Sequence, residues 1–254
     1  MKKLMIAGCM RSGKTLLGTI LNANENVLIT DEFHIFRSIL PASFDFKVFA
    51  QKNWTPFGKI KPYNFDNALG KNYSLAEIRN RVIKHADKVF SLNLFGDSDA
   101  EYINDMIKFL IKGNGDNKCI VMIRDGRSIV HEQLIHYRKC LERNENPAYW
   151  TMKDLNSHRI NFWPTHINSF LSACKLLCKK NLFNNVLIVR YEKLCVNPVK
   201  ELNIIEEFLG IDLKGKKKAK KLIHTEQMFN FDREMLDRCL PSDFKMFLSL
   251  LGYY

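Results

Sequence analysis

A loop bounded by two glycines stands near the start of the chain, between an apolar run and a segment with helical periodicity. The run at residues 4–7 has the composition of a buried strand, and Gly8 and Gly13 enclose the loop that follows. Apolar residues between positions 16 and 21 then recur on one side of a helix. A strand that leads through such a loop directly into a helix is typical of α/β folds, and it places free backbone N–H groups at the helix start.

This loop has the chemistry of a phosphate-binding site. The N–H groups at a helix N-terminus point at an anion, and the helix dipole favours negative charge there. Arg11 and Lys14 add two positive charges next to these groups. The spacing Gly8-x-x-x-x-Gly13-Lys14-Thr15 also satisfies the Walker A pattern, so ATP or GTP is an alternative to other phosphorylated ligands.

Apolar runs alternate with helical patterns along the 254 residues. This alternation predicts an α/β fold with a mostly parallel central sheet covered by helices on both faces. No linker rich in Pro, Gly or Ser divides the chain, so we expect one domain over residues 1–254. The expected strands are residues 4–7, 27–30, 89–94, 119–123 and 186–189, and the expected helices lie near residues 14–24, 74–85, 100–112, 127–142, 159–180 and 199–209.

Charged residues follow several of these expected strands. Asp31, Glu32 and His34 come after the second strand, residues 124–127 after the fourth, and residues 190–192 after the fifth. Because ligands of parallel sheets bind beyond the carboxyl ends of the strands, we expect these residues to meet the glycine loop at one edge of the sheet.

Composition and charge limit the partners and the cellular compartment expected for the protein. The net charge of +12 favours anionic partners, but the lysine run at residues 214–221 contains no interleaved aromatic residues, so we expect a solvated helix face and no nucleic-acid binding. Seven cysteines without CxxC pairs predict reduced thiols and no metal site, and Cys9 is expected to be a buried filler. The apolar runs are too short to span a bilayer, which predicts a cytoplasmic protein without an integral membrane segment.

Four segments in order carry a family resemblance. They are residues 11–17; Asp31-Glu32, which follows residues 21–27; residues 123–131; and residues 189–194 with Asn197-Pro198 and residues 208–211. Residues 251–253 add a fifth, closing similarity. Together they resemble the sulfotransferases that use 3′-phosphoadenosine 5′-phosphosulfate (PAPS), most of all the tyrosylprotein sulfotransferase branch.

The resemblance implies a P-loop sulfotransferase-like three-layer fold. It also implies transfer of a sulfonate from PAPS to a hydroxyl acceptor, such as a peptide tyrosine, a carbohydrate or a small metabolite. The product nucleotide would be adenosine 3′,5′-bisphosphate (PAP), and no metal would be needed. The 5′-phosphosulfate loop would comprise Arg11, Ser12, Gly13, Lys14 and Thr15.

The family motifs also suggest individual roles. Glu32 is the candidate general base, with His34 or His131 as possible assistants, while Lys14 and Arg11 would stabilise the leaving phosphate. Arg124 would bind the 3′-phosphate with help from Ser128, and Tyr191 would lie near the adenine. Arg127 is either a second phosphate contact or a salt-bridge partner of Asp125 or Glu192.

Three positions differ from the family pattern. Glu132 stands where the family has a serine near the 3′-phosphate, and no lysine follows the expected third strand, although Lys14 replaces a threonine and could supply the cation. Two alternatives therefore stay open. One is a P-loop kinase or NTPase that uses ATP or GTP with Mg²⁺, and the other is a non-catalytic relative that binds adenosine bisphosphate.

Overall fold

The computed structural model describes residues 1–38, 75–143, 162–213, 216, 223, 234 and 240–254. In these residues five strands form one parallel sheet in the order β2-β3-β1-β4-β5. The expected parallel sheet is therefore confirmed. The strands are β1 (Lys2–Gly8), β2 (Val27–Asp31), β3 (Leu94–Asp99), β4 (Asn117–Ile123) and β5 (Val186–Arg190).

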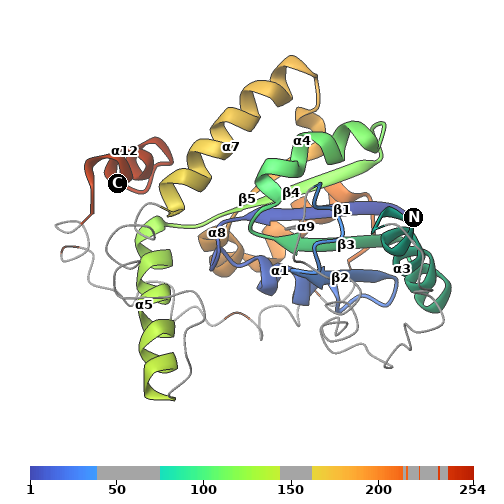
Figure 1. Ribbon diagram of the computed structural model, residues 1–254, viewed down its shortest axis with the longest axis horizontal. Helices are drawn as coiled ribbons and strands as arrows, with labels where there is room; N and C mark the ends of the chain where they lie inside the picture. The colour runs from blue at the N-terminus through green and yellow to red at the C-terminus, as the bar shows by residue number, and fades with distance from the viewer. Residues whose placement is uncertain (39–74, 144–161, 214–215, 217–222, 224–233, 235–239) are drawn as a thin grey trace.

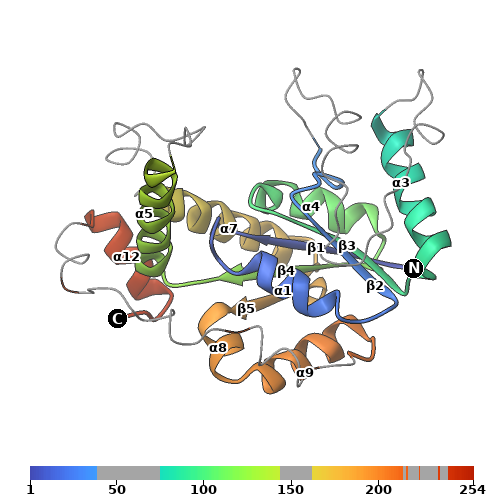
Figure 2. The same ribbon diagram turned by 90° about the horizontal axis from the view of Figure 1, so that it is seen from below.

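Helices cover both faces of the sheet, which makes three layers (Figure 2). Alternate residues of β1 point to opposite faces, so Leu4 and Ile6 join the core under one helical layer while Met5 and Ala7 join the core under the other. The first layer contains α1 (Lys14–Leu21), α8 (Tyr191–Val196) and α9 (Pro198–Leu209), and the second contains α4 (Tyr102–Lys112) and α7 (Phe162–Lys179).

Three further helices lie at the ends of the sheet (Figure 1). The helix α3 (Leu75–Phe90) precedes β3, α5 (Gly126–Glu142) leaves the carboxyl end of β4, and α12 (Ser242–Leu250) packs against α7. The aromatic rings of Trp163 in α7 and Phe244 in α12 have centroids 4.7 Å apart. No helix in the described part of the chain is both long enough and apolar enough to cross a bilayer.

The prediction for the third strand was wrong. Residues 89 and 90 still belong to α3, and the chain turns at Ser91, which has a φ of 49°, before β3 begins at Leu94. The strand was missed because its second half is polar, whereas buried parallel strands are usually apolar. Asp97, Ser98 and Asp99 are nevertheless 0%, 1% and 2% exposed.

The other expected strands and helices are present with shifted ends, and in the described part of the chain two α-helices and the 3-10 helix η2 (Phe183–Asn185) were not expected. The short helix α8 follows β5 directly, and α12 stands near the end of the chain. The lysine run at residues 214–221 lies outside the described residues except for Lys216, whose Nζ is 2.7 Å from Glu206 Oε2.

Candidate functional site

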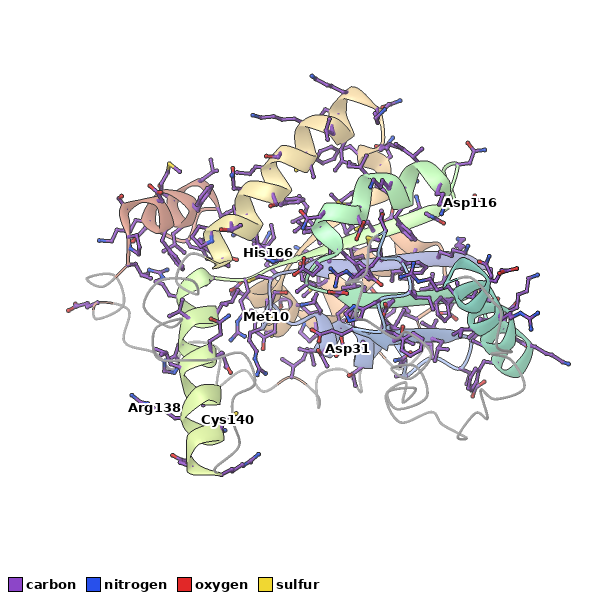
Figure 3. The ribbon with its side chains drawn as sticks, viewed as in Figure 1. Met10, Asp31, Asp116, Arg138, Cys140 and His166 are labelled. Carbon is purple, nitrogen blue, oxygen red and sulfur yellow. The ribbon has the colours of Figure 1, made fainter. Side chains whose placement is uncertain are left out.

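The carboxyl ends of the strands gather the predicted site residues at one edge of the sheet. Figure 3 shows Met10 and Asp31 at this edge, while Asp116, which precedes β4, lies at the opposite edge. A cleft of about 550 Å³ opens here, within the range of small-molecule sites. Its lining includes Arg11, Lys14, Thr15, Glu32, Arg124 and Tyr191, so the expected convergence is confirmed.

The loop between β1 and α1 has a backbone that requires glycine. Gly8 has a φ of 148°, and a Cβ added there would lie 2.6 Å from the carbonyl oxygen of Met122. Gly13 has a φ of 95° and directly precedes α1. Arg11 adopts a φ of 63°, a region that non-glycine residues rarely occupy. The N-terminus of α1, from Gly13 to Leu16, thereby lines the cleft.

Two buried polar atoms beside this loop lack a hydrogen-bond partner in the described part of the chain. They are Ser12 Oγ and Arg124 Nε. Buried polar groups without partners are rare in proteins, and a hydroxyl and a guanidinium N–H both donate to phosphate oxygens. The residues present therefore fit an anionic ligand that adds acceptors.

Lys14 is almost fully buried at the start of α1. Its Nζ donates a hydrogen bond to the carbonyl oxygen of Cys9 over 3.0 Å. Burial lowers the pKa of Lys14, whereas negative charge on neighbours such as Glu32 and Asp31 opposes this shift. Burial also raises the pKa of the Cys9 thiol to about 12, which agrees with an unreactive filler.

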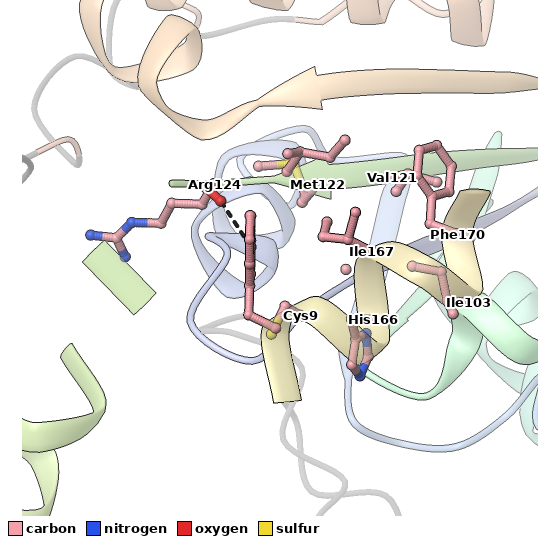
Figure 4. Close-up of a pocket in the computed structure, with 11 residues that line it drawn as sticks. Cys9, Ile103, Val121, Met122, Arg124, His166, Ile167 and Phe170 are labelled. Atoms are coloured by element: carbon pink, nitrogen blue, oxygen red, sulfur yellow. Dashed lines mark hydrogen bonds between the residues drawn. The ribbon is translucent and has the colours of Figure 1, made fainter. Parts of the chain in front are cut away.

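Arg124 joins the two segments that were expected to bind phosphate. Its Nη1 donates to the carbonyl oxygen of Arg11 over 2.9 Å, and its guanidinium lies 4.3 Å from the ring centre of Tyr191. Behind it, Trp163 Nε1 donates to the carbonyl oxygen of Arg124 over 3.2 Å, while the arginine side chain points away from the apolar residues around His166 (Figure 4). The guanidinium is thus held next to the glycine loop.

Tyr191 forms a wall of the cleft beside Gly13. A Cβ added at Gly13 would lie 2.3 Å from Tyr191 Cδ2, so the ring occupies the space that a larger residue would need. Burial raises the pKa of Tyr191 to about 12, with Arg124 opposing the shift, and the phenol stays neutral at physiological pH.

Glu32 stands on the opposite side of the cleft, at the end of β2. It is exposed, has a φ of 50°, and donates its backbone N–H to the carbonyl oxygen of Ser98 over 2.6 Å. Partial removal from water raises the pKa of the Glu32 carboxyl; Asp31 and Asp99 add to this effect and Lys14 opposes it. The carboxylate is therefore more basic than an ordinary glutamate.

Asp31 and His34, which flank Glu32 in the sequence, both have hydrogen-bond partners. Asp31 Oδ2 accepts from Thr15 Oγ1 over 3.0 Å, and its Oδ1 accepts from Ser98 Oγ. His34 Nδ1 lies 2.5 Å from Asp99 Oδ2. These contacts tie the end of β2 to α1 and to β3.

Sequence reasoning missed the carboxylates at the end of β3. Asp97 is fully buried and accepts hydrogen bonds from the backbone N–H groups of Phe33 and Ile35, at 3.2 and 3.1 Å, and from the hydroxyls of Thr30 and Tyr102. Burial nevertheless raises its pKa to about 6. Two aspartates spaced two residues apart after an apolar run were the available signal, because such residues share one face of a strand.

The side chain of Arg127 is buried and pairs with other residues of the protein. It forms a bidentate pair with Asp125, at 3.1 Å from Nε to Oδ1 and 2.8 Å from Nη2 to Oδ2, and Nη2 also donates to the carbonyl oxygen of Tyr253. The salt-bridge alternative is therefore confirmed. Ser128 is buried in the first turn of α5, one helical turn before Glu132, and neither it nor His131 lines the cleft.

The end of the chain packs against the segment that follows β5. Tyr253 Oη donates to Glu192 Oε2 over 3.1 Å, Glu192 Oε1 accepts from the backbone N–H of Asp125 over 2.8 Å, and Arg190 donates to the carbonyl oxygen of Leu251. Two of the resembling segments, residues 189–194 and 251–253, are thus one contact unit that supports the turn after Arg124.

Residues 3–215 match the model of a sulfotransferase family. The chain belongs to this sulfotransferase family. It is 26% identical over 234 residues to protein-tyrosine sulfotransferase A of Caenorhabditis elegans, a match that spans 90% of this chain and 54% of that protein. The resemblance to the tyrosylprotein branch is therefore confirmed, although the chain spans only about half the length of this relative.

Solved sulfotransferase structures share the fold. The sulfotransferase domain of the Synechococcus PCC 7002 olefin synthase superposes with a TM-score of 0.59 at 17% identity, over 99% of this chain and 94% of that one. A mouse sulfotransferase complexed with PAP gives a TM-score of 0.50 at 14% identity, over 92% of this chain and 69% of that one. The expected three-layer sulfotransferase fold is confirmed.

Proposed function

We propose that this protein transfers a sulfonate group from PAPS to a hydroxyl acceptor. The observation that carries the proposal is the contact between Arg124 Nη1 and the carbonyl oxygen of Arg11, at 2.9 Å. This contact brings two cationic groups and the N-terminus of α1 into one cleft, as a nucleotide with phosphates at two positions requires. Family membership and the PAP complex of the mouse relative support the same ligand.

The glycine loop would hold the 5′ end of the donor. The backbone N–H groups at the start of α1 and the hydroxyls of Ser12 and Thr15 are suited to bind phosphate oxygens, and Gly13 allows their close approach. When bound, the donor supplies a sulfonate on a phosphate leaving group that gains negative charge. Lys14 and Arg11 are the cations beside this loop, and they would stabilise that charge.

Glu32 would remove the proton from the acceptor hydroxyl. It lines the same cleft as Lys14, its pKa is raised, and its backbone is fixed by the bond to Ser98. His34, held by Asp99, is the nearest alternative in sequence. A tyrosine hydroxyl in a peptide is the acceptor to test first, because the curated relative is named for that reaction.

Arg124 and Tyr191 would bind the nucleoside end. The guanidinium would pair with the 3′-phosphate, since its Nε lacks a partner in the described residues, and Tyr191 offers an aromatic face beside the loop. Ser128 lies in the first turn of α5 and does not line the cleft, so its proposed role in phosphate binding would be indirect.

The alternatives are less well supported. The family match does not favour a kinase or NTPase, and it favours a transferase over a relative that only binds nucleotide. We also propose one domain over residues 1–254 and a cytoplasmic setting. Six free cysteines in the described part of the chain support a reducing compartment.

Binding of PAP and of adenosine 5′-phosphate (AMP) tests the donor assignment. We expect Arg124→Ala to lower PAP affinity about 10- to 100-fold in calorimetry, as for loss of a charge-assisted contact, and to change AMP affinity little. Arg138→Ala is the matched control, because Arg138 is an exposed arginine on α5, the helix that follows Arg124, and it does not line the cleft. Equal losses for both nucleotides would remove the 3′-phosphate assignment. Sulfonate transfer from PAPS to a tyrosine peptide then tests the reaction.

A further inference from the structure

Glu132 lines the same cleft as Arg124 and faces one end of its guanidinium group. The residue lies in α5, and its Oε1 is 3.6 Å from Arg124 Nη2. Its side chain is 31% exposed, compared with 7% for Arg124. The pair therefore joins a fixed, buried cation to a carboxylate that borders water.

Part of the Arg124 guanidinium is already in contact with the protein. Nη1 donates to the carbonyl oxygen of Arg11, and the flat face lies against Tyr191. The N–H groups of Nη2, which faces Glu132, of Nε, which lacks a partner in the described residues, and the second N–H of Nη1 can still donate to an incoming anion. An anion that binds there meets the negative charge of Glu132 at close range, where like charges repel strongly.

On the basis of the proposed function, we infer that Glu132 is an internal competitor for the 3′-phosphate. Its carboxylate pairs with Arg124 in the free protein and must turn toward water before the phosphate can reach the guanidinium. The partial exposure of Glu132 permits this movement, and ion pairs that border solvent are weak enough to be exchanged.

Gln133 supplies an independent observation that this part of the cleft receives a ligand. Its side chain is 3% exposed, it lines the cleft, and its Nε2 has no hydrogen-bond partner in the described residues. An amide N–H donates to phosphate oxygens but is costly when left unpaired. The unpaired N–H donors of Gln133 and Arg124 therefore favour binding of an anion here, whereas the carboxylate of Glu132 opposes it. Residue 132 thus sets how strongly the protein prefers a 3′-phosphorylated nucleotide.

The test measures the ratio of PAP affinity to AMP affinity in the full chain. We expect Glu132→Gln to raise this ratio about tenfold, a common size for coupling between neighbouring groups, through tighter PAP binding with AMP affinity changed less than about twofold. Glu132→Ser should act in the same direction. Glu142→Gln, at the exposed far end of α5, is the control and should leave the ratio unchanged.

The outcomes separate this inference from the proposed function. If the wild type binds PAP and the ratio stays constant in both Glu132 variants, Glu132 does not compete and the inference fails alone. A lower ratio would also overturn it, because Glu132 would then hold Arg124 in place for the phosphate. If neither the wild type nor any variant binds PAP, both the inference and the proposed donor fail. Unfolding midpoints of the variants, measured in parallel, identify any loss of fold.

Discussion

Replacing Gly13 by alanine tests how tightly the glycine loop and Tyr191 depend on each other. Gly13 has a φ of 95°, and an added Cβ would lie 2.3 Å from Tyr191 Cδ2. Both the backbone and the neighbouring ring therefore oppose a side chain. Gly115 provides the control, because it has the same φ of 95° but, in the described residues beyond its chain neighbours, no atom within 4 Å of an added Cβ.

The two variants separate the backbone cost from the packing cost. Left-handed backbone costs an L-residue roughly 1–2 kcal/mol, so Gly115→Ala should lower the free energy of unfolding by about this amount. Gly13→Ala adds the displacement of the Tyr191 ring, and overpacking costs typically about 1–3 kcal/mol. The expected loss for Gly13→Ala is therefore about 2–5 kcal/mol.

Urea unfolding gives both values, and PAP calorimetry gives the functional consequence. A displaced Tyr191 no longer supports the guanidinium of Arg124, so PAP affinity should fall in Gly13→Ala and stay unchanged in Gly115→Ala. The reasoning is refuted if Gly13→Ala costs no more stability than Gly115→Ala, or if it binds PAP as tightly as the wild type.

Two further variants test the acidic side of the cleft. Glu32→Gln should lower kcat far more than PAP affinity, and an unchanged kcat in this variant would assign the base to His34 instead. The wild-type rate should also fall as pH drops through the raised pKa of Glu32. The pKa of Asp97 is raised from 3.8 to about 6, so its stabilising contribution is full below pH 3.8 and is lost as pH rises through about 6. The stability advantage of wild type over Asp97→Asn should therefore shrink by roughly 2 kcal/mol between pH 4 and pH 7, since each pKa unit corresponds to about 1.4 kcal/mol and part of the shift lies below pH 4. Urea unfolding at both pH values checks this, and a constant difference would contradict it.

The sequence predicted the strands that are apolar runs, including β5, although Ile188 in β5 is exposed. The strands β1, β2, β4 and β5 are apolar runs. The glycine loop, with positive φ at Gly8 and Gly13, marks the start of α1. Arg124 was also predictable, because a charged residue directly after an apolar strand must lie at the carboxyl edge of a parallel sheet.

The end of β3 was not predictable by the same rule. Asp97 is fully buried without an apolar side chain, and it is stabilised by donors from residues 30–35 and 102, which only the folded sheet brings together. Hydrophobic periodicity does not register such long-range hydrogen bonds. The role of Arg127 depended in the same way on a distant segment, since its partner Tyr253 is 126 residues away.

The order of the strands divides the cleft into an acidic and a basic side. Strands β2 and β3 lie on one side of β1 and end in Asp31, Glu32 and Asp99, whereas β4 lies on the other side and ends in Arg124. Under the proposed function, the anionic donor would lie on the side of Arg124, where Glu132 is the opposing carboxylate, and the neutral hydroxyl that must lose a proton would lie on the side of Glu32.

Lys14 stands at the boundary between these two sides, because the β1 loop is central in the sheet. Its charge interacts with Glu32, Asp31 and Asp99, and the corrected third strand still contains no lysine. Among the described residues that line the cleft, Lys14 is the lysine at this boundary. Under the proposed function, a threonine at position 14 would remove the buried charge that opposes Glu32 and Asp31, and Lys14 would let the base and the anionic leaving group share one cleft.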